Sequence, residues 1–162
     1  MIDPAAVLLV EAALRELGHA GEVRHLDTPV PTSAAAAEVL GCEPAAIANS
    51  LVFVADGVPV LVLASGGRRV KTQRLRAALG ARKVSLAPPD VVLAATGQAV
   101  GGVAPVGHPA PLRTLVDESL GRYGVIWAGG GDELTMVSTT LAELLRMTGG
   151  DLLAEEPPQP PS

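Results

Sequence analysis

The chain has 162 residues, of which 48% are hydrophobic but only 2% aromatic, and its formal net charge is −5. This length suits one domain with an aliphatic core, while the scarcity of aromatic rings argues against recognition of several stacked bases and the acidic balance against indiscriminate nucleic-acid binding. A single cysteine excludes an internal disulfide, and the sequence shows neither a basic leader nor an apolar run of membrane-spanning length, so we expect a cytoplasmic protein.

Capping residues predict two helices in the first quarter of the chain. Asp3 followed by Pro4 is typical of a helix start, because the carboxylate caps the first turn and proline fits the first helical position. Thr32 or Ser33 caps the second helix, which Gly41 ends. The expected elements are a helix over residues 4–17, a strand over 22–26 and a helix over 33–40.

A β-hairpin is expected next. Residues 51–55 and 58–64 are rich in β-branched side chains, and Asp56-Gly57 between them favours a two-residue turn. Alternate residues of the second strand are apolar on both faces, which is typical of a strand inside a sheet that is covered on both sides.

The rest of the chain mixes helices and strands. Thr72 is expected to cap one helix, Pro88-Pro89 to open another, and Thr140 with Glu143 to form a capping box for the last. The expected elements are helices over 72–79 and 88–95, strands over 82–86, 112–116, 124–128 and 134–137, and a last helix that ends at Gly149-Gly150. These elements predict an α/β or α+β fold, with a mixed, mostly antiparallel central sheet covered by helices.

The chain is interpreted as one domain with a tail. Residues 1–153 carry all the expected elements and show no internal repeat. Residues 154–162 are rich in proline and poor in apolar side chains, so we expect them to be disordered.

Positive charge is concentrated in one segment. No aspartate or glutamate lies between Asp56 and Asp90, and seven of the 12 lysines and arginines fall there: Arg68, Arg69, Lys71, Arg74, Arg76, Arg82 and Lys83. A local cationic surface on an acidic protein suits docking of one nucleic-acid backbone, for which Arg68, Arg69, Lys71 and Arg74 are the candidates. The alternative is an ordinary solvated helix face.

The most informative segment is the glycine-rich stretch 97–108, which reads Gly-Gln-Ala-Val-Gly-Gly-Val-Ala-Pro-Val-Gly-His. Glycines allow turns that a side chain would block and let a ligand approach bare N–H groups. Such a loop is a candidate cradle for a carbonyl oxygen or an oxyanion. The alternative is a surface loop with no chemistry.

Other standard sites are not supported by the sequence. The histidines at 19, 25 and 108 are scattered and have no thiolate pair nearby, so neither a metal site nor a cofactor is expected. Val70-Lys71-Thr72 lacks the glycine that a phosphate-binding loop has before its lysine. Cys42 is interpreted as a small buried residue rather than a nucleophile. An enzyme with this sequence is therefore expected to work without a reactive side chain or a metal.

The pattern of Gly101, Gly102, Pro105 and Gly107 resembles the glycine loop of the YbaK/prolyl-tRNA-synthetase-associated editing domain family. Further segments resemble other parts of that family in the same order, and the resemblance covers about residues 20–150. These segments are 32–41, 47–53, 115–117, 128–131 and 141–145.

The resemblance implies a free-standing aminoacyl-tRNA deacylase that hydrolyses the ester of mischarged tRNA in trans. An aminoacyl ester is already activated, so a protein can hydrolyse it by positioning a water and stabilising the oxyanion with backbone N–H groups. The implied partner is the acceptor end of aminoacyl-tRNA, with no membrane and with a homodimer left open. The alternative is a catalytically impaired homologue that binds aminoacyl-tRNA, an amino acid or a nucleotide without turnover.

The resemblance also implies roles for the loop residues. Gly101 and Gly102 match the positions that would supply backbone donors, and Pro105 would make the wall of the pocket rigid. Gly107 and His108 would close the loop. For His108, a hydrogen bond to substrate and a structural role both remain open.

Further implied substrate-binding positions lie outside the glycine loop. Ser50 matches the hydroxyl beside the family's lysine, and Thr32 matches the start of the early helix, where it either lines the pocket or only caps the helix. Asp117 would orient loop amides or cap a turn. A second glycine turn would frame the pocket from the other side, and it consists of Gly129, Gly130 and Gly131.

One position departs from the family pattern. Where the family carries a lysine that holds the phosphate or ribose of the terminal adenosine, this chain has Asn49. Asparagine keeps a hydrogen-bond donor but loses the charge and several ångströms of reach. Asn49 is therefore a candidate catalytic residue with altered chemistry, and Lys71 or Arg74 are candidates to replace the missing charge.

Overall fold

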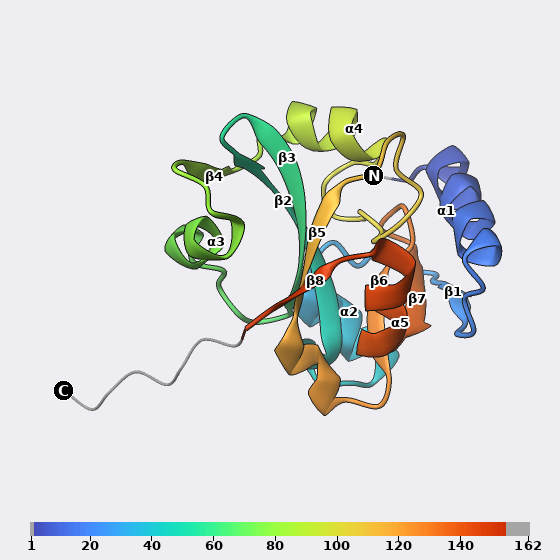
Figure 1. The fold of residues 1–162 in the computed structure, drawn as a ribbon. Helices are drawn as coiled ribbons and strands as arrows, with labels where there is room; N and C mark the ends of the chain where they lie inside the picture. Colours follow the sequence, from blue (N-terminus) through green and yellow to red (C-terminus); the bar gives the residue numbers. More distant parts are fainter. Residues whose placement is uncertain (1, 155–162) are drawn as a thin grey trace.

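The structure is a computed structural model that describes residues 2–154, and its elements are shown in Figure 1. The strands are β1 (Val23–His25), β2 (Ile47–Ala55), β3 (Val58–Ser65), β4 (Val84–Leu86), β5 (Arg113–Asp117), β6 (Ile126–Gly129), β7 (Thr135–Thr139) and β8 (Asp151–Leu153). The helices are α1 (Pro4–Glu16), α2 (Ser33–Leu40), α3 (Thr72–Leu79), α4 (Pro89–Thr96) and α5 (Leu141–Thr148), with short 3-10 turns η1 (Pro44–Ala46) and η2 (Glu118–Arg122). The expected disorder of the tail from residue 155 onward lies outside the described residues.

All the strands belong to one mixed sheet of order β1-β7-β6-β2-β3-β5-β8, and β4 pairs with β2 beside this path. The pairs β1–β7, β2–β3, β2–β4 and β6–β7 are antiparallel, and the pairs β2–β6, β3–β5 and β5–β8 are parallel. The expected fold class, a mixed and mostly antiparallel sheet covered by helices, is confirmed. The pattern did not predict β8, which extends the sheet after α5.

Local capping chemistry fixes several helix ends as the sequence predicted. The Asp3 carboxylate accepts from the N–H of Ala6, and the Thr32 hydroxyl accepts from the N–H of Ala35. One expectation is wrong by a residue: Thr72 is the first residue of α3, and the N-cap is Lys71, which makes no capping hydrogen bond with its side chain.

The expected capping box of α5 is only half formed. The Thr140 hydroxyl accepts from the N–H of Glu143, as predicted. The Glu143 carboxylate does not return to Thr140 but accepts from the hydroxyl of Thr139 and the N–H of Ala20. A long-range contact to the segment after α1 thus replaces a local one.

Strand β3 is buried on both faces, as its apolar pattern predicted. Val60 and Val62 pack in one cluster with Leu75 of α3. On the other face, Leu61 and Leu63 join a larger cluster that includes residues of α1 and α5. Figure 1 shows α3 on one side of the β2–β3 hairpin and α1 and α5 on the other. The sheet is therefore the middle layer of the molecule.

The edge of β2 that faces away from β3 has a break. It pairs with β6 at Ile47 and Ala48, and with β4 only from Phe53 onward. The two-residue turn makes the odd-numbered residues of β2 bond to β3, so the even-numbered ones direct their N–H and C=O groups at the other edge. Val52 is satisfied there, since its carbonyl accepts from Ala87. Ser50 is the position left at the break.

Candidate active site

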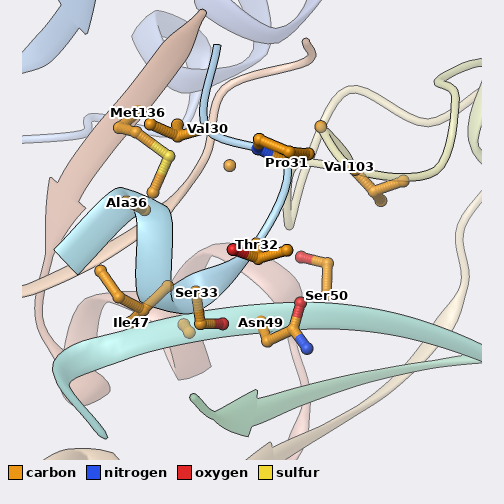
Figure 2. A pocket seen from close by; sticks show the side chains of 14 residues that line it. Val30, Pro31, Thr32, Ser33, Ala36, Ile47, Asn49, Ser50, Val103 and Met136 are labelled. Carbon is orange, nitrogen blue, oxygen red and sulfur yellow. The ribbon is translucent and has the colours of Figure 1, made fainter. Parts of the chain in front are cut away.

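A pocket opens at this break in the edge of β2 (Figure 2). Its walls come from the segment that enters α2, from β2, from the loop between α4 and β5 and from β6 and β7, and they leave a cavity of about 50 Å³. None of the lining side chains is charged. The lining residues are Val30, Pro31, Thr32, Ser33, Ala36, Ile47, Ala48, Asn49, Ser50, Gly101, Gly102, Val103, Gly129 and Met136.

Six of the residues predicted for the site line this pocket: Thr32, Asn49, Ser50, Gly101, Gly102 and Gly129. Sequence reasoning missed its apolar end, which consists of Val30, Ala36, Ile47 and Met136. Figure 2 shows Val30, Ala36 and Met136 together on the side away from Ser50 and Val103. Each of these side chains is a single apolar residue in a different segment, so no local pattern marks them.

Glycine is required where the glycine loop meets the turn after β6. A Cβ on Gly102 would lie 2.4 Å from the Cα of Asp132, and a Cβ on Gly129 would lie 2.5 Å from the carbonyl oxygen of Val103. The N–H of Gly131 donates to the carbonyl of Gly102 over 2.9 Å. The two glycine segments therefore hold each other in place by close backbone packing.

The second glycine turn divides between two roles. Only Gly129 lines the pocket. The N–H of Gly130 donates to the carbonyl of Thr135, and the N–H of Gly131 donates to the carbonyl of Gly102. The structure thus places Gly130 and Gly131 in the support of the loop, outside the pocket lining.

The N–H groups of the two loop glycines differ. That of Gly102 donates to the carbonyl of Ala99 over 3.3 Å, which is longer than usual. That of Gly101 has no acceptor within residues 2–154, and Gly101 is exposed at the pocket wall with a φ of +99°. The expected pair of open donors therefore reduces to the Gly101 N–H.

Two hydroxyls and an amide line the polar part of the pocket. The Thr32 hydroxyl caps α2 and keeps its own proton free to donate. The Asn49 side chain lies on an exposed residue of β2. The Ser50 Oγ is buried and has no hydrogen-bond partner in the described structure, a state that costs about 1–3 kcal/mol. In Figure 2 the Ser50 hydroxyl points toward the Thr32 side of the pocket.

The second half of the glycine loop lies elsewhere, which corrects the expectation that it borders the same pocket. Pro105, Gly107 and His108 line a separate depression formed with α1 and α5. The loop turns away at Ala104 because the buried side chain of Gln98 accepts from the N–H of Ala104 and donates to the carbonyl of Val106.

His108 has a structural partner. Its Nε2 is 2.9 Å from the carbonyl oxygen of Ala104, a contact that requires the proton on that nitrogen. Burial lowers the pKa of His108, although the hydrogen bond to Ala104 opposes this shift. His108 is thus neutral at pH 7 and holds the loop by a backbone contact.

Asp117 caps a turn, which was one of its two open roles. Its carboxylate accepts from the N–H and the hydroxyl of Ser119 at the start of η2, and also from the N–H of Ser65 at the end of β3. It is buried and does not line the pocket.

The basic segment is split between two ends of β2. Arg68 and Arg69 are exposed on the loop after β3. This loop begins next to Gly66, which packs closely on Ser33 at the pocket rim, because a Cβ on Gly66 would lie 3.0 Å from the hydroxyl oxygen of Ser33. Arg82 and Lys83 lie at the opposite end, where their N–H groups donate to Asp56 in the hairpin turn.

Two residues of the basic segment lie on or beside α3. Lys71 precedes its first turn, and Arg74 within it donates to the carbonyl of Ala154 over 3.1 Å. Neither lines the pocket. Within the pocket wall, therefore, neither replaces the lysine that the family carries at the position of Asn49.

Other chemistries find no support in residues 2–154. No group of three or more histidine, cysteine or acidic side chains there is arranged to hold a metal ion. Burial, with a further contribution from Glu43, raises the pKa of Cys42, which disfavours the thiolate that a nucleophile needs. No helix in the described part is long and apolar enough to cross a membrane.

Comparison with known proteins identifies the family. The sequence profile of the aminoacyl-tRNA editing domain family matches residues 27–147. This range contains every residue that lines the pocket. This chain therefore belongs to the aminoacyl-tRNA editing domain family.

Individual relatives agree with this assignment. The uncharacterized protein YwhH of Bacillus subtilis is 31% identical over 124 residues, which are 76% of this chain and 78% of YwhH. A proline–tRNA ligase of Nitratidesulfovibrio vulgaris is 37% identical over 97 residues, which are 58% of this chain but only 17% of the ligase. A crystal structure described as a candidate trans-editing enzyme for prolyl-tRNA synthetase superposes with a TM-score of 0.86 at 35% identity and covers 94% of this chain and 96% of its own.

Proposed function

We propose that this protein is a free-standing aminoacyl-tRNA deacylase, which hydrolyses the ester of mischarged tRNA in trans. The observation that carries the proposal is a pocket without charged lining side chains, which has Gly101 in its wall and no acceptor for the Gly101 N–H within residues 2–154. A fixed backbone donor costs no reorganisation when charge develops on a carbonyl oxygen, and one such donor contributes about 3 kcal/mol to the transition state. The family membership makes an aminoacyl ester the substrate of choice.

The two ends of the pocket suit the two parts of an aminoacyl ester. The apolar end, with Val30, Ala36 and Met136, would take the amino-acid side chain, and its limited volume favours a small one. The ester carbonyl would then lie at the polar end beside Gly101. Attack by water on this carbonyl releases the free amino acid, and the ribose oxygen of the tRNA takes up a proton. No covalent enzyme intermediate is therefore needed.

The acceptor stem of the tRNA would approach over the loop after β3. Arg68 and Arg69 are exposed beside the rim at Ser33. Their positive charge would attract the phosphates of the tRNA, which the uncharged pocket lining does not do. Changing both to glutamine should weaken tRNA binding about tenfold and flatten its salt dependence. The matched control changes Arg82 and Lys83, and equal affinity for both double variants would overturn this docking surface.

The proposed activity is tested with a panel of aminoacyl-tRNAs. Each is incubated with the purified protein, and ester loss is followed against the rate in buffer. We expect at least one tRNA that carries a small amino acid to be deacylated faster than in buffer. If no member of the panel loses its ester above the buffer rate, the enzyme proposal is wrong.

A binding protein without turnover is the second candidate, and Asn49 is the observation that favours it. A neutral side chain replaces the family's lysine at the pocket, and charge-assisted hydrogen bonds contribute about 1.5–3 kcal/mol against about 1 for neutral ones. Asn49→Lys separates the two. Activity that appears from zero supports the binding protein, whereas unchanged or reduced activity supports an enzyme built around asparagine.

A further inference from the structure

The hydroxyl of Ser50 is unusual within the described residues because it is the one buried side-chain oxygen or nitrogen without a hydrogen-bond partner. Buried polar groups in folded proteins almost always have a partner, which is a protein atom, an ordered water or a ligand. Since no protein atom in residues 2–154 fills this place, the hydroxyl makes no contact that would offset the cost of its burial. A partner for it would have to come from the content of the pocket.

The surroundings of Ser50 favour water as that partner. Ser50 lies at the break in the edge of β2, where its own N–H and C=O also have no neighbouring strand. A bound water needs two to four polar partners, and the break offers them in one place. The apolar residues that suit an amino-acid side chain lie at the other end of the pocket.

No titratable side chain lines the pocket, and the carboxylate of Glu133 lies outside the lining but beside Gly101, where a Cβ on Gly101 would be 2.9 Å from the Glu133 Oε1. A serine hydroxyl can accept one hydrogen of a water molecule and leave an oxygen lone pair directed at a carbonyl carbon. Gly101, on the loop wall, has an N–H without an acceptor in residues 2–154, which would donate to the carbonyl oxygen of a bound ester. Ser50 on the strand and Gly101 on the loop thus provide separate positions for the nucleophile and the oxyanion.

We propose that the Ser50 hydroxyl binds the water that attacks the ester carbonyl. The inference rests on the proposed function and names the residue that positions its nucleophile. In the reaction, the water oxygen bonds to the carbonyl carbon, the bond from that carbon to the ribose oxygen breaks, and the proton of the water ends on the ribose oxygen. Ser50 is unchanged at the end.

The kinetic test compares Ser50→Ala and Ser50→Thr, using the aminoacyl-tRNA that the wild-type protein hydrolyses fastest. We expect Ser50→Ala to lower kcat by about 10- to 100-fold with KM within twofold of wild type. Ser50→Thr, which keeps the hydroxyl, should restore most of kcat. The matched control is Ser85→Ala, because Ser85 is an exposed strand serine outside the pocket, and it should change neither constant.

Thermal stability separates this role from a structural one. Because the hydroxyl has no protein partner, Ser50→Ala should melt no lower than the wild-type protein. A wild-type kcat in Ser50→Ala, or a loss of kcat that accompanies a lower Tm and is not rescued by threonine, would overturn the inference.

A crystal structure of the free protein gives a readout that does not need activity. We expect an ordered water within hydrogen-bond distance of the Ser50 Oγ and no water at that place in Ser50→Ala. A hydroxyl bonded to a protein acceptor would overturn the inference while leaving the proposed function intact. Failure of the wild-type protein on every aminoacyl-tRNA overturns the proposed function itself, and the attacking water with it.

Discussion

The two halves of the glycine loop have the same kind of sequence but different surroundings. Gly101, Gly102 and Val103 line the pocket at the break in β2, whereas Pro105, Gly107 and His108 line a depression beside α1. The difference arises within one residue, at Ala104, where the side chain of Gln98 takes the backbone N–H. A glycine-rich sequence thus permits a cradle, but the contacts that hold the loop decide which of its amides faces a ligand.

The first half of the loop packs against the turn after β6, and the second half does not. Gly102 packs directly on the backbone of Asp132 and accepts from the N–H of Gly131. The second half packs on α1, where a Cβ on Gly107 would lie 3.1 Å from the Cα of Val10. Substitutions in the first half should therefore affect activity most, and those in the second half mainly stability.

The largest effect is expected from Gly102→Ala. The added Cβ would lie 2.4 Å from the Cα of Asp132, so the loop must move away from the turn and carry the Gly101 N–H with it. We expect deacylation to fall at least about 100-fold and unfolding free energy to fall by about 1–3 kcal/mol. Gly124→Ala is the control, since no atom lies within 4 Å of its added Cβ. Full activity in Gly102→Ala would remove the loop from the mechanism.

A smaller effect on activity but a clear one on stability is expected from Gln98→Leu. The variant keeps the volume of a buried side chain but leaves the N–H of Ala104 and the carbonyl of Val106 without their partner. Two such groups cost about 2–4 kcal/mol, measured by chemical denaturation. Gln73→Leu, on the exposed side of α3, is the control. Equal stability of the two variants would mean that Gln98 does not separate the halves of the loop.

The smallest effect is expected from His108→Gln, with kcat and KM within twofold of wild type. Burial lowers the pKa of His108 below its ordinary 6.5, so protonation favours the unfolded chain and stability decreases as the pH falls below about 6.5. The glutamine variant should lose less stability than the wild-type protein between pH 7.5 and pH 5.5, as followed by denaturant titration. A large loss of kcat would instead mean that His108 takes part in the reaction.

The sequence determined much of the local structure. The caps at Asp3, Thr32 and Thr140 and the turn at Asp56-Gly57 were readable because each depends on groups within a few residues of one another. The burial of β3 on both faces followed from its own apolar pattern. The resemblance to the editing family also named six residues that line the pocket.

Tertiary structure alone decided the site itself. The pocket exists because β6 and β4 pair with different parts of β2 and leave Ser50 between them, and strand pairing of this kind is a long-range property. The same holds for the Gln98 contact that divides the glycine loop and for the turn-capping role of Asp117. A sequence pattern reports what one segment prefers, whereas an open N–H or an unpartnered hydroxyl depends on which other segments come close enough to satisfy it.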